Sequence, residues 1–296
     1  MNIGSCHSCR AMQRAKRIRG SCVTCFSSKR GGGKMNDRCV QAAIVTGSTR
    51  GIGHAIATSL AQANIAVVVN GTTEEGVNRT VAEIKEAGCL AVGVTGRVEE
   101  METGKKLTQA ALDAFGRIDY LVNNAGIVAD RMSHKLDEQD WDRVLAVHAK
   151  GTFACTQPFL QAKKEVGTGG VIINMTSLAG LHGVVGQLNY AAAKGAILAM
   201  TYTLAQEWQQ AGIRVHAISP AALTDMTRPH VEKAEAAARA KGEELPDYWR
   251  IGQPEDVARL VLHLITHPTE TGTVWGVNGE QIGLWSKPAY QQTIIE

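Results

Sequence analysis

Residues 46–53 read Thr46-Gly47-Ser48-Thr49-Arg50-Gly51-Ile52-Gly53, and they join the short apolar run 42–45 to an amphipathic stretch at 52–63. Glycines at this spacing let the backbone turn tightly and approach a phosphate, while the helix that follows offers unpaired N–H groups and a positive dipole end. Glycine-rich turns also occur for purely structural reasons. Placed between a strand and a helix, this one is more typical of dinucleotide binding. We therefore predict that the turn holds a pyrophosphate, with cofactor contacts at Gly47, Thr49, Arg50, Gly51, Ile52 and Gly53.

The rest of the chain repeats this strand-then-helix order. Seven short, mostly continuous apolar runs are the strand candidates, as expected for strands buried on both faces of a parallel sheet: 42–45, 65–69, 90–92, 120–122, 171–173, 213–215 and 273–275. Helices are predicted between them at 52–63, 74–87, 101–115, 137–165, 188–211 and 254–267. The pattern predicts one doubly wound α/β domain of Rossmann type over 37–296, with a seven-stranded, mainly parallel sheet and helices on both faces.

Composition and charge exclude several classes of protein. The chain has 296 residues, of which 44% are hydrophobic and 20% charged, and no run of eighteen apolar residues. Its net charge of +3 arises because eight basic residues precede Asp37, whereas all 28 acidic residues lie at or after it. The domain itself is therefore net acidic, and we predict neither a nucleic-acid partner nor a membrane span.

The first 36 residues form a basic, acid-free tail. Its four cysteines, in two Cys-x-x-Cys pairs, have a spacing that could enclose one zinc ion: Cys6, Cys9, Cys22 and Cys25. Few apolar residues are present to pack around a metal, so we predict no metal site and a disordered tail. An organelle-targeting peptide is the alternative. The scattered Cys39, Cys89 and Cys155 favour a reducing compartment, which we take to be the cytoplasm, or an organelle matrix if the tail directs import.

The end of the second predicted strand bears on which dinucleotide is bound. A carboxylate there would accept a hydrogen bond from the ribose 2′-hydroxyl and repel a 2′-phosphate. The chain reads Val-Asn-Gly-Thr-Thr over 69–73 and has no carboxylate until Glu74. Arg50 lies in the glycine turn, where a guanidinium could pair with a phosphate, although it could also be a solvated surface charge. We predict NADP(H) rather than NAD(H).

Three further residues suggest acid–base chemistry. Tyr190 and Lys194 are four residues apart in a predicted helix, so the two side chains share one face. An ammonium close to a phenol favours the phenolate, and we expect Lys194 to lower the pKa of Tyr190. Ser177 follows the apolar run 171–173, at the carboxyl edge of the sheet where ligands bind.

On these motifs, residues 40–285 resemble the short-chain dehydrogenase/reductase family. The glycine turn, Asn123-Asn124-Ala125-Gly126, and Ser177 thirteen residues before Tyr190 all match its pattern. The resemblance implies that Ser177 binds the substrate carbonyl, Tyr190 protonates it, and Lys194 holds the nicotinamide ribose. Further cofactor contacts are implied at Thr72, Val98, Asn124, Ala125, Gly126, Pro220, Tyr190 and Lys194. It also implies a homotetramer, assembled through the long helices and the C-terminal strand.

The chain departs from the family pattern in places. His148 stands where the family has a catalytic asparagine, and either a proton relay to Lys194 or a packing role would suit it. Arg97 replaces the aspartate expected near adenine, which leaves Val98 to act through its backbone. The polar segment 225–248 lies where the family places a substrate lid. Met226, Trp249 and His182 are candidate pocket residues, although simple packing is the more common role for each.

The function predicted from the sequence is NADP(H)-dependent reduction of a small carbonyl compound, most simply a 3-oxoacyl thioester. The ending at 283–288 and His148 are similar to dehydrogenases that act on 3-hydroxyacyl thioesters in multifunctional β-oxidation enzymes. Two alternatives remain. One is a dehydrogenase of another secondary alcohol, such as a steroid, terpene or cyclic alcohol, and the other is a dinucleotide-binding protein without turnover.

Overall fold

The computed structural model describes residues 40–289. Its strands form one sheet in the order β3-β2-β1-β4-β5-β6-β7-β8. They are β1 (Ala42–Val45), β2 (Ala66–Gly71), β3 (Ala91–Thr95), β4 (Tyr120–Asn123), β5 (Gly170–Met175), β6 (Ile213–Ala221), β7 (Thr273–Asn278) and β8 (Gln281–Trp285). Strands β1 to β7 run parallel, and β8 returns antiparallel to β7. The order reverses at β1, so the sheet is doubly wound and the predicted fold class is confirmed.

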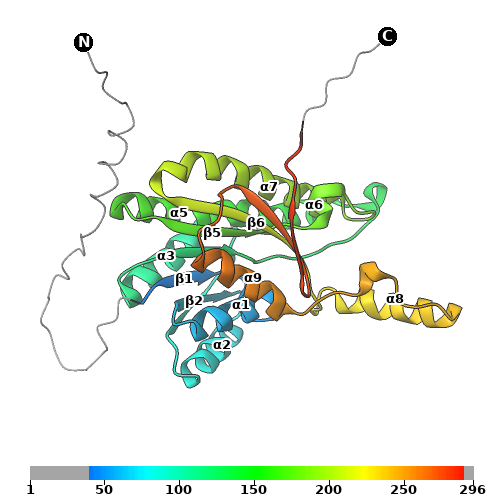
Figure 1. Cartoon of the computed structure of the whole chain (residues 1–296), viewed down its shortest axis with the longest axis horizontal. Coiled ribbons are helices and arrows are strands. Elements are labelled where there is room, and N and C mark those ends of the chain that lie inside the picture. The colour runs from blue at the N-terminus through cyan, green and yellow to red at the C-terminus, as the bar shows by residue number, and fades with distance from the viewer. Residues whose placement is uncertain (1–39, 290–296) are drawn as a thin grey trace, which may run out of the picture. The chain divides into compact units, whose positions relative to one another are not determined.

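Helices cover both faces of this sheet (Figure 1). They are α1 (Gly51–Gln62), α2 (Glu74–Glu86), α3 (Met101–Phe115), α4 (Glu138–Leu145), α5 (Gly151–Val166), α6 (Leu178–His182), α7 (Leu188–Trp208), α8 (Arg228–Lys241) and α9 (Pro254–Thr266). Short 3₁₀ turns occupy Ser133–Lys135, Gln209–Ala211 and Asp247–Trp249. Residues of α1, α2 and α9 pack in one large core cluster and those of α3, α5 and α7 in a second, and a small third cluster contains Leu198 of α7.

The alternation of side chains along the strands explains these two cores. In β1, Ala43 and Val45 belong to the α1/α2/α9 side and Ile44 to the α3/α5/α7 side. All four residues of β1 are buried, as are all six of β2. A strand with apolar residues on both faces is stable only between two helical layers, which explains why the apolar runs are continuous rather than alternating.

Two sequence-based predictions about secondary structure were wrong. The sheet has eight strands rather than seven, because the edge strand β8 is exposed at every residue and Gly283 interrupts its apolar residues, so it lacks the continuous apolar run of a buried strand. The single helix predicted at 137–165 is instead α4 and α5, separated by a π-helical segment at Ala146–Lys150. A single π-helical turn continues the helix with i→i+5 hydrogen bonds, so the spacing of apolar residues does not distinguish it from an α-helix.

Some sequence-based predictions lie outside the described residues. These are the predicted tail at 1–36, its four cysteines and Cys39. Between residues 40 and 289, no group of three or more His, Cys, Asp or Glu side chains is arranged to hold a metal ion. Within the same range, no helix is both long enough and apolar enough to cross a membrane.

Candidate active site

The glycine turn joins the carboxyl end of β1 to α1. Gly47 and Gly51 have φ angles of +60° and +54°, which glycine adopts without the strain a side chain would bring. Arg50 is the N-cap of α1, and its side chain makes no capping hydrogen bond. The first N–H groups of the helix therefore remain available to an anion. A Cβ on Gly47 would lie 2.8 Å from Ala125 Cα, so this turn also needs glycine in order to approach the next loop.

The loop after β4 packs directly on this turn. Asn124 Nδ2 donates to the carbonyl oxygens of Thr46 at 2.9 Å and Gly47 at 3.1 Å. The hydroxyl of Thr46 accepts the N–H groups of Asn124 and Ala125 at 2.9 and 3.1 Å. The structure thus brings the predicted contacts Gly47, Asn124 and Ala125 together at the carboxyl edge of the sheet, and they fit a bound dinucleotide.

The end of β2 presents no carboxylate to this region. The side chain of Asn70 turns inward, where its Oδ1 accepts the Gly47 N–H at 3.2 Å and its Nδ2 donates to the carbonyls of Val94 and Gly96 at 3.1 and 3.2 Å. Asn70 thus ties the glycine turn to the end of β3. Sequence reasoning missed this role, although an amide at the end of a valine run was the available signal.

The remaining predicted cofactor contacts lie around the same edge. Arg50 is 79% exposed, with Nη1 4.0 Å from a carboxylate oxygen of Asp225, so it is free to move toward a ligand. Thr72 is exposed, and Pro220 lies near the carboxyl end of β6. Val98 is buried, with its side chain in the core, so a contact with a ligand would have to come from its backbone.

Ser177, Tyr190 and Lys194 meet across the carboxyl end of β5. Ser177 is the N-cap of α6, and its Oγ accepts the Ala179 N–H at 3.2 Å. Lys194 Nζ donates to the Met175 carbonyl at 2.6 Å and lies 5.4 Å from the centre of the Tyr190 ring. A side-chain hydrogen bond joins Tyr190 to Ser177.

The chain holds these elements together from both sides. Thr176 Oγ1 donates to the Lys194 carbonyl at 3.1 Å, while the Lys194 side chain returns to β5. A Cβ on Gly180 would lie 2.6 Å from the Lys194 carbonyl carbon, so α6 and α7 approach closely only because residue 180 is glycine. This packing fixes the position of the serine relative to the tyrosine–lysine pair.

The pKa of Tyr190 differs from what the sequence predicted. Burial raises the pKa of Tyr190 to about 12, with the Ser177 hydrogen bond opposing the rise. Burial also lowers the pKa of Lys194 to about 7. The expectation that Lys194 lowers the Tyr190 pKa was wrong for this structure, because the ammonium is itself only 3% exposed and loses its solvation. At neutral pH the phenol keeps its proton and can donate it.

His148 lies beside this pair, on the π-helical segment. Its ring meets the Tyr190 ring edge-on, with centroids 5.1 Å apart. Nε2 lies 2.8 Å from the Ile127 carbonyl oxygen and 3.1 Å from the Ile127 nitrogen, whereas the buried Nδ1 has no hydrogen-bond partner. Burial, followed by the Lys194 charge, lowers the pKa of His148 to about 3, so the imidazole is neutral at physiological pH.

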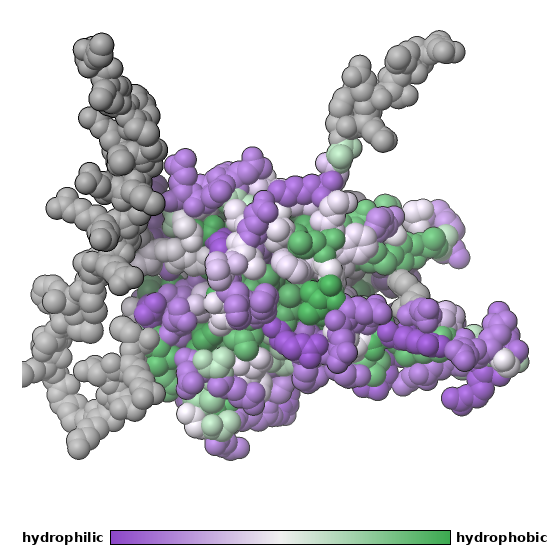
Figure 2. All heavy atoms as spheres, viewed as in Figure 1, coloured by the Kyte–Doolittle hydropathy of each residue, from purple (hydrophilic) through white to green (hydrophobic). Residues whose placement is uncertain are grey.

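The candidate lid begins beside the glycine turn, where Asp225 lies 4.0 Å from Arg50 Nη1. Helix α8 extends away from the sheet (Figure 1), and its visible surface is largely hydrophilic (Figure 2). Met226 is 38% exposed, and the Trp249 ring stacks on His230 with centroids 6.4 Å apart. His182 is exposed at the end of α6, where its ring lies 5.2 Å from that of Trp285. None of the three candidate pocket residues is packed in the main core clusters.

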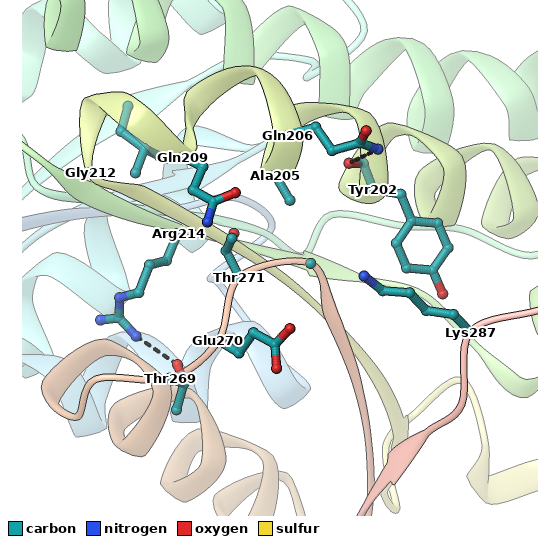
Figure 3. A pocket seen from close by; sticks show the side chains of 12 residues that line it. Tyr202, Ala205, Gln206, Gln209, Gly212, Arg214, Thr269, Glu270, Thr271 and Lys287 are labelled. Carbon is teal, nitrogen blue, oxygen red and sulfur yellow. Dashed lines mark hydrogen bonds between the residues drawn. The ribbon is translucent and has the colours of Figure 1, made fainter.

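A hollow at the other end of the sheet is separate from this site (Figure 3). It has a volume of about 580 Å³ and includes Ile213 at the start of β6 and Gly272 just before β7. Arg214 beside it donates to Thr269 Oγ1 at 2.7 Å. Because ligands of doubly wound sheets bind at the carboxyl ends of the strands, this hollow is not the dinucleotide site.

Comparison with known proteins decides the family. A family model described as short chain dehydrogenase matches residues 41–235, which include the glycine turn, Ser177, Tyr190 and Lys194. The chain belongs to the short-chain dehydrogenase family. This short-chain dehydrogenase is therefore an oxidoreductase that uses a nicotinamide cofactor and acts on CH–OH groups.

This short-chain dehydrogenase is similar to several proteins of named activity. It is 38% identical over 249 residues to a 3-oxoacyl-(acyl-carrier-protein) reductase of Synechocystis sp., covering 82% of this chain and 97% of that protein. It is 41% identical over 189 residues to the peroxisomal hydratase-dehydrogenase-epimerase of Neurospora crassa, covering 63% of this chain but only 20% of that protein. A crystal structure of a short chain dehydrogenase from Mycobacterium avium matches with a TM-score of 0.73 at 34% identity, covering 86% of this chain and 88% of that one.

Proposed function

We propose that this short-chain dehydrogenase is an NADP(H)-dependent reductase of 3-oxoacyl thioesters. The observation that carries the reaction is the meeting of Ser177, Tyr190 and Lys194 beside the glycine turn, with Tyr190 protonated at neutral pH. The relatives named 3-oxoacyl-(acyl-carrier-protein) reductase support the substrate class.

In the proposed reaction, Ser177, Tyr190 and Lys194 have different roles. The bound cofactor would supply the hydride that the C3 ketone carbon of the substrate accepts. Ser177 donates a hydrogen bond to the ketone oxygen, and Tyr190 transfers its phenolic proton to that oxygen as the alcohol forms. Lys194, held on the Met175 carbonyl, lies near enough to stabilise the phenolate that this leaves and to hold the nicotinamide ribose. The products are the 3-hydroxyacyl thioester and NADP⁺.

The preference for NADP(H) is supported by the end of β2. Asn70 is turned into the fold and Gly71 has no side chain, so no acid there opposes a 2′-phosphate. Arg50 and Thr72 are exposed beside it and would bind the phosphate. Arg50→Ala should weaken NADPH binding at least about tenfold and NADH binding much less, measured by nicotinamide fluorescence titration. Equal weakening of both would remove Arg50 from phosphate recognition.

A substrate panel tests the reaction. Purified protein is mixed with NADPH and acetoacetyl-CoA, and the loss of nicotinamide absorbance is followed, with cyclic and steroidal ketones in parallel. Oxidation of NADPH with the acyl thioester is expected. Turnover confined to the cyclic or steroidal ketones would replace the acyl assignment with another secondary alcohol. Cofactor binding without turnover of any ketone would favour a binding protein instead.

A further inference from the structure

The methyl group of Thr49 fills the space beside the last residue of β2. A Cβ built on Gly71 would lie 2.5 Å from Thr49 Cγ2 and 3.3 Å from Val77 Cγ2. A Cβ on Gly76, in the first turn of α2, would lie 3.4 Å from Thr49 Cβ. The glycine turn of the first βα unit thus packs one threonine against two glycines of the second.

The Thr49 methyl group makes the closest contact with a side chain at position 71, at 2.5 Å, whereas Thr49 Oγ1 and Val77 Cγ2 would each lie 3.3 Å away. Gly71 is not among the glycines with a left-handed backbone, so its conformation would accept an L residue. Thr49 cannot easily rotate away, because a β-branched side chain has few χ1 rotamers and Gly71 and Gly76 both lie against it. The side chain of the neighbouring Asn70 hydrogen-bonds to the Gly47 N–H and to two carbonyl groups, so it does not occupy the space beside position 71.

Position 71 is also where an acid would select the cofactor. A carboxylate at the end of the second strand binds the ribose 2′-hydroxyl of NAD(H), and its charge repels the 2′-phosphate of NADP(H). We propose that Thr49 determines cofactor specificity, because its methyl group excludes an acidic side chain from position 71 and keeps this end of the site open to a phosphate. The inference rests on the proposed NADP(H) preference and names the residue that enforces it.

The steric part is tested without any cofactor. Gly71→Ala adds a Cβ and no charge, and in the full-length chain it should lower the midpoint of thermal unfolding by about 4 °C. In a Thr49→Ser background, which removes only the methyl group, Gly71→Ala should change the midpoint of thermal unfolding little. Alanine reduces the conformational entropy of the unfolded chain, and this offsets the remaining steric effect. An equal loss in both backgrounds, or no loss in either, would overturn the proposal.

The specificity part is tested by binding. Gly71→Asp alone should weaken both NADPH and NADH, since the side chain cannot be placed. Thr49→Ser with Gly71→Asp should bind NADH about tenfold more tightly than Gly71→Asp alone and prefer NADH to NADPH, measured by fluorescence titration. If Gly71→Asp alone binds NADH as tightly as the double variant, the methyl group does not act as proposed.

These outcomes are separate from those of the proposed function. None of the measurements needs a substrate, so a failure to reduce acyl thioesters leaves them intact. Tighter binding of NADH than NADPH by the native chain would overturn the proposed cofactor preference. The alanine comparison would still show whether the Thr49 methyl closes position 71.

Discussion

The phenol of Tyr190 and the ammonium of Lys194 are both withdrawn from water, and burial favours the neutral form of each. It raises the pKa of Tyr190 to about 12 and lowers that of Lys194 to about 7. A protonated phenol is the form needed to deliver a proton during ketone reduction. A lysine that titrates near neutrality can supply or accept a proton next to it.

Removing the Tyr190 hydroxyl tests its role as the acid. Tyr190→Phe should lower kcat by about 10²- to 10⁴-fold, since Ser177 would still donate a hydrogen bond to the ketone oxygen but would not transfer the proton that Tyr190 supplies. Affinity for NADPH, measured by fluorescence, should change little. Tyr202→Phe is the control, because Tyr202 lies on the same helix but lines the hollow at the other end of the sheet. Retained turnover in Tyr190→Phe would exclude Tyr190 as the acid.

The buried ammonium makes stability depend on pH. The folded-state pKa of Lys194 is about 7, below its ordinary value of 10.5, so between these values the unfolded chain binds more protons and the folded state gains stability as pH rises. From pH 7 to pH 9 this gain should be about 2 kcal/mol without cofactor. Lys194→Met keeps the packing volume and should lose this rise, measured by urea unfolding at both pH values. Parallel pH profiles for the two proteins would contradict the shifted pKa.

At the scale of elements, the π-helical segment Ala146–Lys150 determines where His148 lies. The change from α4 to α5 passes through this segment, and His148 within it is buried against Gly126 and Ile127. A Cβ on Gly126 would lie 2.5 Å from His148 Cε1, so the glycine makes room for the ring. The imidazole thereby connects the loop after β4 to the ring of Tyr190.

Substitution of His148 separates a hydrogen-bonding role from simple packing. His148→Phe keeps the ring but loses the Nε2 contact with Ile127, and kcat/KM should fall about ten- to hundredfold as the loop loses its position. His148→Asn keeps hydrogen-bonding groups and should lose less activity. Because the pKa of His148 is about 3, neither change should move the pH profile of kcat between pH 5 and 9. A shifted profile, or equal activity of both variants, would contradict this view.

Two central strands are also tied together by buried amides. Asn123 Nδ2 donates to Thr156 Oγ1 at 3.0 Å and to Asn174 Oδ1 at 2.9 Å, and Asn174 Nδ2 donates to Thr201 Oγ1 at 2.9 Å. This chain of hydrogen bonds joins α5, β4, β5 and α7 beneath the site. These buried hydrogen bonds favour one arrangement of the elements, which the separate motifs do not, although the Oδ1 atom of Asn123 has no hydrogen-bond partner.

At the scale of the whole molecule, β8 leaves one edge of the sheet exposed. Its Ile282 and Leu284 are 44% and 60% exposed, and Phe153 on α5 is 47% exposed. An exposed edge strand with apolar side chains is a surface that another chain can cover. These residues lie on the elements through which the predicted homotetramer would assemble.

A substitution in β8 tests whether the protein assembles through this strand. The native protein should have the mass of a tetramer by light scattering, and Leu284→Glu should shift it to smaller species, because burying an unpaired carboxylate in an interface is costly. Leu90→Glu is the matched control, since Leu90 is 46% exposed beside β3 at the opposite edge of the sheet. A monomeric native protein, or an unchanged mass in Leu284→Glu, would contradict assembly through this strand.

The sequence alone determined the parts of the protein that depend on local geometry. A turn such as 46–53 needs its glycines whatever surrounds it, and residues four apart on a helix share a face, so the glycine turn and the Tyr190–Lys194 pair could be read directly. Continuous apolar runs likewise predicted the seven parallel strands, since only burial between two helical layers favours them.

Only the tertiary structure decided the features that depend on packing between distant residues. Strand β8 pairs with β7 although its apolar residues are exposed and do not form a continuous run. The orientation of Asn70 and the contact of Thr49 with Gly71 join separate βα units. The pKa values of Tyr190, Lys194 and His148 depend on how much water each loses when the helices close over the sheet. Desolvation is a property of the assembled fold, and no spacing of residues along the chain encodes it.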